Sequence, residues 1–241
     1  MSYTGGKSQE GVFQRIINLI PGHRIYVEPF LGSGAILRLK RPAELSFGID
    51  KNLAPFRQHT APNMACVHRT RLIQGDGLAF LESYPFNGSE FVYCDPPYLL
   101  STRGNRKRYR HEMTDAEHGR LLAIIRGLPC HVLLSGYPSP FYDAGLPGWN
   151  REEFDVMTRG HTWAREVLWF NYPRPAAIHD ASLVGINWRE RQRIEKRCKR
   201  WKNRIVSLEP MERAALFSAL VDVIDPATIL GAAAGLLKRG A

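Results

Sequence analysis

The sequence has few cysteines, and none of them is placed for a metal site or a disulfide framework. The four residues, Cys66, Cys94, Cys130 and Cys198, are scattered, form no CxxC pair and accompany no histidine at zinc spacing. This pattern argues against a scaffold held together by disulfides or zinc and predicts a reducing compartment. We therefore expect no metal in the protein.

The sequence also lacks a long uninterrupted apolar run. Its N-terminus, residues 1–7, has no apolar core of the kind that a secretion signal requires. The most apolar stretch, residues 214–237, is interrupted by Asp222, Asp225 and Pro226. A stretch broken in this way predicts two short packed helices rather than a membrane span. We therefore expect no membrane partner.

Negative charge is scarce relative to positive charge, and the imbalance is local. The 241 residues include 33 Lys and Arg against 23 Asp and Glu, a formal net charge of +10. Residues 99–110 hold five cations and no acid, and residues 185–204 hold nine cations and two acids. These two segments carry all of the excess, which favours a polyanionic partner. A solvated helix face is the alternative for the second segment.

Short apolar runs alternate with helical segments through most of the chain, as in a parallel α/β sheet. The first five runs predict strands, at residues 25–27, 45–49, 72–73, 91–94 and 131–134. Two later runs predict an antiparallel hairpin because no full helix separates them, at residues 153–157 and 166–170. Helices are predicted over residues 8–20, 35–40, 52–65, 114–126 and 187–205. The sequence thus predicts a Rossmann-like, mostly parallel seven-stranded sheet with a terminal antiparallel hairpin.

A basic helical appendage, residues 185–241, is predicted to follow a main domain of residues 1–184. Asn187 begins a capping-box pattern that opens the basic helix, and Asp225-Pro226 opens a last helix. An apolar stripe along the basic helix is expected to pack on the main domain. It consists of Ile194, Cys198, Trp201 and Ile205.

Three polar motifs follow predicted strands, where ligands of parallel α/β sheets bind. The first, Gly32-Ser33-Gly34, lets the backbone approach a ligand closely. It is not the dinucleotide fingerprint, because Leu37 stands where the third glycine belongs. The second is Asp50, one strand later, where an acid suits hydrogen bonds from ribose hydroxyls. A helix N-cap is the alternative role for this aspartate.

The third motif is Asp95-Pro96-Pro97-Tyr98, at the end of the fourth strand. The lone pair of the adenine amino nitrogen is delocalised into the ring, which makes this nitrogen a poor nucleophile. The Asp95 carboxylate and the Pro96 carbonyl can accept the two amino hydrogens and so direct the lone pair at a methyl donor. Tyr98 can stack on a flipped base. An ordinary strand-ending turn is the alternative for the tetrapeptide alone.

Together these motifs resemble those of the Dam-like, alpha-order class of N6-adenine DNA methyltransferases. The resemblance covers residues 3–172 and rests on Tyr3-Thr4-Gly5-Gly6-Lys7, Glu28-Pro29-Phe30-Leu31-Gly32-Ser33-Gly34, Gly48-Ile49-Asp50-Lys51-Asn52, Gly75-Asp76, Asp95-Pro96-Pro97-Tyr98 and Glu166-Val167-Leu168-Trp169-Phe170-Asn171-Tyr172. It implies a class I methyltransferase fold, S-adenosylmethionine as cofactor and DNA as partner. It also implies a cytoplasmic, nucleoid-associated protein of a restriction–modification or phage system.

The resemblance further implies a role for each matching residue. Asp95 and Tyr98 would serve the target adenine, and Glu28 would lie at the methionine end of the cofactor. The whole cofactor site would consist of Tyr3, Lys7, Glu28, Phe30, Gly32, Ser33, Asp50, Asp76 and Asp95.

One departure from the family concerns DNA recognition. Dam-like enzymes usually carry a helical recognition insert, whereas here only about 18 residues separate Asp76 from Asp95. We therefore expect a very short recognition site or nearly indiscriminate adenine methylation. The residues expected to contact nucleic acid are Arg103, Asn105, Arg106, Lys107, Arg108, Arg110, Arg193, Arg197 and Arg200. Arg103, Asn105 and Arg106 could reach base edges, and contact of the whole loop with phosphates alone is the alternative.

Two other functions are compatible with the same sequence. One is methylation of adenine in structured RNA, because the basic segments do not distinguish the two nucleic acids. The other is a non-catalytic nucleic-acid-binding protein on a methyltransferase fold, against which the intact Asp95, Tyr98 and glycine turn argue. Methylation of cytosine N4 or of a protein glutamine is disfavoured, because such enzymes usually have Ser or Asn in place of Asp95.

Overall fold

A seven-stranded sheet in the order β3-β2-β1-β4-β5-β7-β6 forms the centre of the protein. The computed structural model describes residues 7–61, 67–103, 110–157, 163–185 and 187–224. The strands are β1 (Ile25–Glu28), β2 (Leu45–Asp50), β3 (Thr70–Gln74), β4 (Glu90–Cys94), β5 (His131–Gly136), β6 (Asn150–Met157) and β7 (Trp163–Phe170). The first five strands pair in parallel, and β7 pairs antiparallel with β5 and β6. This confirms the predicted fold class, a Rossmann-like, mostly parallel seven-stranded sheet with a terminal antiparallel hairpin.

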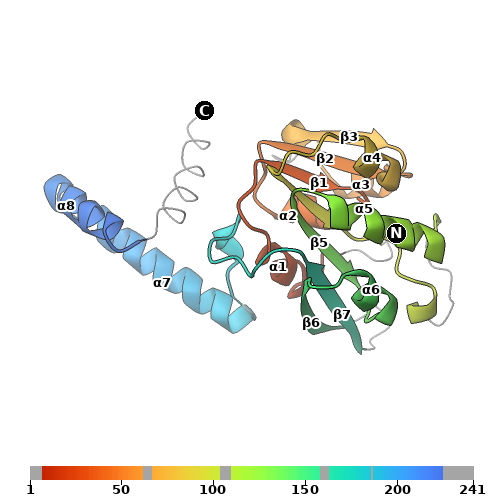
Figure 1. Cartoon of the computed structure of the whole chain (residues 1–241). Helices are drawn as coiled ribbons and strands as arrows, with labels where there is room; N and C mark the ends of the chain where they lie inside the picture. The colour runs from red at the N-terminus through yellow and green to blue at the C-terminus, as the bar shows by residue number, and fades with distance from the viewer. Residues whose placement is uncertain (1–6, 62–66, 104–109, 158–162, 186, 225–241) are drawn as a thin grey trace.

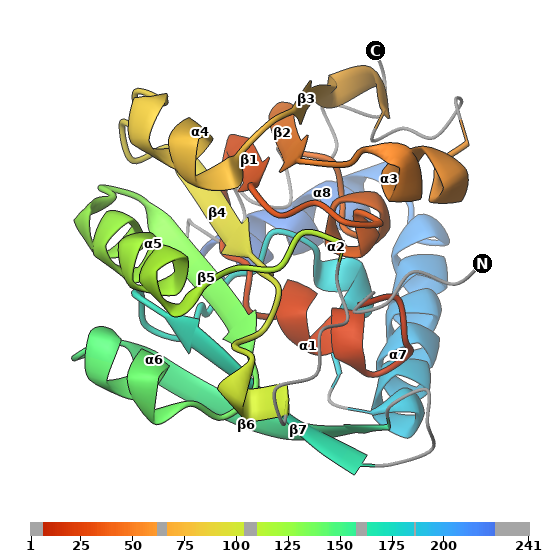
Figure 2. The same ribbon diagram turned by 90° about the vertical axis from the view of Figure 1, so that its right-hand side faces the viewer.

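Helices cover both faces of the sheet (Figure 2). One face carries α1 (Val12–Ile17), α2 (Ala35–Leu39) and α3 (Ala54–His59), and the other carries α4 (Gly77–Ser83), α5 (Asp115–Gly127) and α6 (Pro140–Gly145). Three short 3-10 helices lie at Val67–Arg69, Ser101–Arg103 and Ala181–Leu183. Because the central strands are buried on both faces, successive residues belong to two separate cores. On β4, Phe91 and Tyr93 face α1, whereas Val92 and Cys94 face the opposite core.

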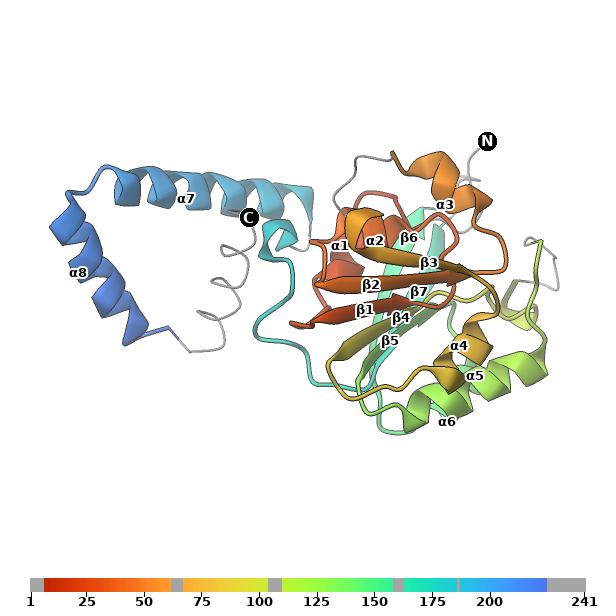
Figure 3. The ribbon, with the colours of Figure 1, turned by 90° about the horizontal axis from the view of Figure 1, so that it is seen from above.

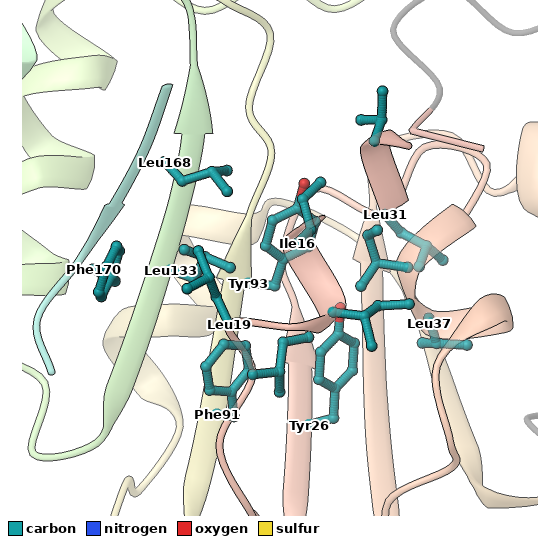
Figure 4. Packing of buried hydrophobic residues seen from close by; sticks show 14 of the residues in the cluster. Ile16, Leu19, Tyr26, Leu31, Leu37, Phe91, Tyr93, Leu133, Leu168 and Phe170 are labelled. Carbon is teal, nitrogen blue, oxygen red and sulfur yellow. The ribbon is translucent and has the colours of Figure 1, made fainter. Parts of the chain in front are cut away.

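The core under α1 positions the N-terminal segment of the chain (Figure 4). Ile16 and Leu19 pack against Tyr26 of β1 and Phe91 of β4, and all four side chains are buried. Full burial of a large apolar side chain contributes about 1.5–3 kcal/mol. With α1 held in this way, Lys7 on its N-terminal side contacts Asp95 at the carboxyl end of β4.

The helix predicted over residues 8–20 is shorter in the structure, because α1 covers only Val12–Ile17. Gly11 precedes it with a φ of 89°, in the left-handed region from which a right-handed helix does not continue. After α1 the hydrogen bonds span three residues instead of four, because the Leu19 N–H donates to the Ile16 carbonyl at 3.0 Å. Helix α6 was not predicted; its N-cap Ser139 accepts the Tyr142 N–H.

Helices α7 (Trp188–Val206) and α8 (Pro210–Val221) extend away from the sheet as an arm (Figures 1 and 3). The predicted cap of α7 is confirmed, because the Asn187 side chain accepts the Glu190 N–H at 2.9 Å. No residue of either helix is buried. None of the helices in the described ranges is long and apolar enough to cross a membrane.

The prediction that the apolar stripe of α7 packs on the main domain is wrong. Trp201, at the centre of the stripe, is 55% exposed, and Cys198 is also exposed. A narrow stripe offers little apolar area, whereas packing would desolvate several of the nine cations on the same helix. The contact of α7 with the body lies near its start, where Arg191 pairs with Glu10 at 3.0 Å. The last helix predicted from Asp225 lies outside the described residues.

Two stacked histidines join the segment after β7 to the start of β1. The ring centroids of His23 and His179 are 3.9 Å apart, and the His179 N–H donates to the Ile20 carbonyl at 2.8 Å. Burial, with a smaller effect of the Lys40 cation, lowers the pKa of His179 to about 3 and that of His23 well below its ordinary value. Both rings are therefore neutral in the folded protein at pH 7.

Acid is expected to destabilise the fold through these two rings. In the unfolded chain each histidine has a pKa of about 6.5 and takes up a proton as the pH falls, whereas the folded protein resists this, although Asp180 near His179 partly favours the charged form. The contribution of the neutral rings to the free energy of unfolding is therefore fully present above about pH 7. Below about pH 6.5 it decreases by up to about 1.4 kcal/mol per pH unit for each ring. Urea unfolding at pH 7 and pH 5 should show a smaller acid loss for His179→Gln than for wild type. An equal loss in both proteins would contradict the prediction.

Candidate active site at the carboxyl ends of the strands

A cavity of about 350 Å³ lies at the carboxyl ends of the first four strands. Its walls come from the turns after β1, β2, β3 and β4, at the point where the strand order reverses between β1 and β4. The cavity is lined by eight of the nine residues predicted to bind the cofactor, namely Lys7, Glu28, Phe30, Gly32, Ser33, Asp50, Asp76 and Asp95. The ninth, Tyr3, lies outside the described residues.

The turn after β1 presents backbone atoms to the cavity. Gly32 and Gly34 have φ angles of 51° and 62°, which glycine adopts without strain. A Cβ atom at Gly34 would lie 2.4 Å from the Phe56 ring. The turn is tied to β2 because the Leu31 N–H donates to the Ile49 carbonyl at 2.9 Å. The position therefore requires glycine for space as well as for conformation.

Asp50 ends β2 and holds the glycine turn in place. One carboxylate oxygen accepts the Gly32 N–H and the other accepts the Asn52 N–H, each at 2.8 Å. Each oxygen keeps further acceptor capacity for a ligand in the cavity. The N-cap of α3 is Leu53, so the alternative that Asp50 caps this helix is wrong.

Asp76 lies at the rim of the cavity as the N-cap of α4. Its Oδ1 accepts the Leu78 and Ala79 N–H groups at 2.8 and 3.2 Å, and its Oδ2 pairs with Lys51 Nζ at 2.9 Å. Partial burial raises the pKa of Asp76, but the stronger combined effect of these hydrogen bonds lowers it below its ordinary value. This carboxylate is therefore ionised and already committed to protein contacts.

Glu28 is a buried carboxyl group among the residues that line the cavity. It is 3% exposed, and the Tyr26 hydroxyl donates to its Oε2 at 2.9 Å. Burial raises the pKa of Glu28 to about 8, against the opposing effect of this hydrogen bond. The group is therefore mostly neutral at pH 7, and a cationic ligand beside it would favour its ionised form.

Asp95 follows β4 with one carboxylate oxygen held on both sides. Ser135 Oγ and Lys7 Nζ each donate to Oδ1 at 2.8 Å. Oδ2 accepts no hydrogen bond from the residues that the structure describes. Tyr93 supports Ser135, because their hydroxyl oxygens lie 3.1 Å apart. The arrangement leaves one oxygen of a fixed carboxylate for a ligand.

Tyr98 lies behind the cavity wall in a buried polar cluster. Its hydroxyl accepts a hydrogen bond from Lys7 and donates to Glu166 Oε2 at 2.6 Å. Burial raises the pKa of Glu166, although Lys7 and Tyr98 oppose the effect. Pro97 lines the cavity, whereas Pro96 and Tyr98 do not. The Tyr98 hydroxyl is therefore held between two residues that are far apart in the sequence, Lys7 and Glu166.

Arg103 does not reach the surface, which overturns the prediction that it contacts nucleic acid. Its side chain is 2% exposed, and Nε donates to the Tyr98 carbonyl at 2.7 Å. The guanidinium also donates to both carboxylate oxygens of Glu112, at 3.3 and 2.6 Å. A buried arginine held in this way has no donor directed at a base edge. It instead links Tyr98 to Glu112, the residues on either side of the basic segment 99–110.

The other predicted nucleic-acid contacts are separated in the structure. Arg110 is exposed and lines the cavity. The arginines of α7, which extends away from the sheet (Figure 1), are also exposed, and they are Arg193, Arg197 and Arg200. Four predicted contacts lie outside the described residues, namely Asn105, Arg106, Lys107 and Arg108.

Sequence reasoning missed Ser135 as a site residue, and it named Glu166 only as part of a motif that matches the family, without a role of its own. Ser135 lies at the end of β5, the strand beside β4, so its place at a strand end was the available signal. Glu166 is a charged residue at the start of an otherwise apolar run in β7. Among the described residues, no group of three or more His, Cys, Asp or Glu could hold a metal ion.

Comparisons with known proteins give similarity of structure only. No protein-family model and no curated protein sequence matches the chain. A conserved hypothetical protein of Streptococcus pyogenes is 11% identical, with a TM-score of 0.47 over 70% of this chain and 99% of the other. Magnesium protoporphyrin IX methyltransferase of Synechocystis with bound SAM is 14% identical, with a TM-score of 0.43 over 67% of this chain and 76% of the other. An rRNA methylase of Streptococcus thermophilus is 11% identical, with a TM-score of 0.44 over 66% of this chain and 93% of the other. Identities this low say nothing about the reaction or the substrate of this chain.

Proposed function

We propose that this protein transfers a methyl group from S-adenosylmethionine to the N6 amino group of adenine in DNA. The observation that carries the proposal is the Asp95 carboxylate on the cavity wall, with Oδ1 held by Lys7 and Ser135. Oδ2 accepts nothing from the described residues and remains for a ligand. A fixed acceptor beside a cavity with a glycine turn suits an amino group that must react with a bound nucleoside cofactor.

The cavity suits S-adenosylmethionine by its chemistry. The cofactor supplies an electrophilic methyl group on a positively charged sulfur. Asp50 offers acceptor capacity for ribose hydroxyls, and the turn at Gly32 and Gly34 allows a ligand to approach the backbone. Glu28 is a buried carboxyl group that a cationic ligand would ionise. The volume of about 350 Å³ is in the range of small-molecule sites.

The residues of the Asp95-Pro96-Pro97-Tyr98 turn would then act on the target base. Asp95 Oδ2 would accept a hydrogen bond from one N–H of the adenine amino group. The Pro96 carbonyl oxygen would accept a hydrogen bond from the other N–H, although Pro96 does not itself line the cavity. Two acceptors favour a pyramidal nitrogen whose lone pair is directed at the cofactor. The Tyr98 ring is 5% exposed and does not line the cavity, so it would stack on the flipped base only after the turn moves to uncover it.

Methyl transfer from a tritium-labelled cofactor tests the reaction and the substrate together. Duplex DNA, single-stranded DNA and RNA are offered separately, and the labelled nucleoside is identified after digestion. N6-methyldeoxyadenosine is the expected product. Transfer to RNA alone would make structured RNA the substrate, and transfer to none of the three would contradict the proposal.

Long-read mapping of DNA from a methylation-deficient host that expresses the protein tests the expected specificity. It should show methylation at a very short site or at scattered adenines, and a fully respected site of five or more base pairs would contradict this expectation.

Removing the Asp50 carboxylate is expected to weaken cofactor binding. A hydrogen bond to a charged group contributes about 1.5–3 kcal/mol, so calorimetry should show a correspondingly larger dissociation constant for Asp50→Ala. Asp50→Asn is the matched control, because its amide oxygen still accepts the Gly32 N–H that holds the turn. We expect an intermediate loss in Asp50→Asn. An unchanged constant in both variants would limit Asp50 to a structural role.

We assign α7 to the sugar-phosphate backbone of the nucleic acid. Replacing Arg193, Arg197 and Arg200 by Gln is expected to weaken binding to all sequences alike. If each contacts one phosphate, the slope of log affinity against log salt falls by about 2.7 units on duplex DNA. Fluorescence anisotropy at several salt concentrations measures the slope.

The matched control for the α7 variant removes three other exposed arginines, at Arg24, Arg57 and Arg126. It lowers the net charge by the same amount but leaves α7 intact. We expect a much smaller change of slope. An equal change in both triple variants would show that overall charge, and not α7, determines the salt dependence.

A further inference from the structure

Lys7 contacts the groups that would serve the target base. Its ammonium lies 2.8 Å from Asp95 Oδ1, donates to the Tyr98 hydroxyl and lies 3.9 Å from Glu166 Oε2. It also lies over the Tyr98 ring, 4.7 Å from the centroid. The side chain is 7% exposed, so these contacts are shielded from solvent.

We infer that Lys7 is a positioning residue for the target base, which sets the Asp95 carboxylate and the Tyr98 ring relative to each other. The inference rests on the proposed function, and it differs from the role in cofactor contact that the family resemblance implies for this lysine.

The first argument concerns the rotation of the Asp95 carboxylate. Ser135 and Lys7 both donate to Oδ1, from β5 and from the segment before α1. With two donors on one oxygen, rotation of the carboxylate would break two hydrogen bonds, each of them charge-assisted. Oδ2 is thereby kept as the acceptor for a ligand. Ser135 alone would hold the carboxylate by one hydrogen bond only.

The second argument concerns the link between the acceptor and the stacking ring. Lys7 directs one of its donors at Asp95 and another at the Tyr98 hydroxyl, which in turn donates to Glu166. The carboxylate must lie in the plane of the amino group, while the ring must lie parallel to the base. One cation that contacts both side chains fixes these two requirements together.

The third argument is electrostatic. Lys7 is a cation that contacts both acids of the cluster, the half-buried Asp95 and the buried Glu166. Burial already raises the pKa of Glu166, and the positive charge of Lys7 opposes this rise. Loss of the ammonium would leave the Asp95 and Glu166 carboxyl groups without a neutralising positive charge. Repulsion between them would then favour protonation or displacement of one of the two.

Lys7→Met tests the inference, because methionine keeps most of the volume and removes the charge. Calorimetry should show an unchanged cofactor dissociation constant. The single-turnover rate at saturating cofactor should fall by about 10²-fold, the scale of a small misplacement of reacting groups. Lys7→Arg, which keeps the charge and the donors, should recover part of the rate. A larger dissociation constant with an unchanged saturated rate would identify Lys7 as a cofactor ligand and overturn the inference.

Lys40→Met is the matched control, because Lys40 is also a buried lysine but does not line the cavity. It should lose stability in thermal unfolding without the loss of the saturated rate. Crystal structures of wild type and Lys7→Met provide a readout that is independent of activity. The Asp95 carboxylate should rotate or shift in the variant, and an unmoved carboxylate and Tyr98 ring would overturn the inference. If wild type methylates no nucleic acid, the proposed function fails, while this structural comparison still decides the role of Lys7.

Discussion

Asp95→Ala is expected to reduce the rate of methyl transfer by about 10²–10⁴-fold, the usual contribution of a positioned acid–base or acceptor group. The variant removes Oδ2, the acceptor for the substrate amino group, and it also removes the partner of Lys7 and Ser135. The cofactor dissociation constant should change far less than the rate, because the contacts of Asp50 and of the glycine turn remain. Single-turnover kinetics at saturating cofactor, with calorimetry on the same preparation, measures both quantities.

Asp155→Ala is the matched control for this loss. Asp155 is an exposed carboxylate of β6 that pairs with Arg165 on the sheet edge, away from the cavity. The substitution makes the same chemical change and should leave the rate unaltered. Near-wild-type turnover in a folded Asp95→Ala protein would contradict the role of Asp95 as the acceptor for the amino group and, with it, the proposed reaction.

Gly77→Ala is expected to damage both the fold and the cavity. A Cβ atom at Gly77, the first residue of α4, would lie 2.0 Å from the Pro29 carbonyl oxygen, which is backbone and cannot rotate away. Overpacking of this kind costs about 1–3 kcal/mol. At roughly 2–4 °C per kcal/mol for a chain of this size, the melting temperature should fall by about 2–12 °C. Because Pro29 lies in the cavity wall, its displacement should also raise the cofactor dissociation constant.

Gly127→Ala is the matched control, because a Cβ atom there meets nothing within 4 Å and the residue has no positive φ. It should leave the melting temperature unchanged or slightly raised, since alanine reduces the freedom of the unfolded chain. Thermal unfolding of the three proteins with and without cofactor separates the two effects. A Gly77→Ala protein that melts and binds like wild type would show that α4 can shift to accept the methyl group.

The sequence predicted the sheet because its signals are local. Each central strand is a short apolar run followed by a polar or glycine-containing turn, and this pattern does not depend on distant residues. The hairpin β6–β7 was predicted from the missing helix between two apolar runs, and its register now pairs Phe154 with Glu166. Helix lengths were predicted less well, because α1 depends on the conformation of Gly11 and α6 on the cap at Ser139.

Failures of prediction concern residues whose partners only the fold provides. In the sequence Arg103 is one of several cations of a basic segment. In the structure its side chain is buried and hydrogen-bonded to Glu112 and to the Tyr98 carbonyl. The stripe of α7 has helical spacing, yet none of its residues is buried by the part of the protein that the structure describes. In both cases composition and spacing were interpreted correctly, and the choice between exposure and burial was decided by contacts that spacing does not encode.

The sequence by itself determined the fold class and placed the glycine turn, Asp50 and Asp95 at one edge of the sheet, because the carboxyl ends of parallel strands meet there whatever the details of packing. Only the tertiary structure decided how these residues are paired. Lys7 lies 88 positions before Asp95, and Glu166 lies 68 positions after Tyr98. No periodicity relates residues so far apart, and their contacts arise because α1, β4 and β7 pack around one core. The free oxygen of Asp95, which defines the proposed chemistry, is therefore a consequence of packing and not of the motif alone.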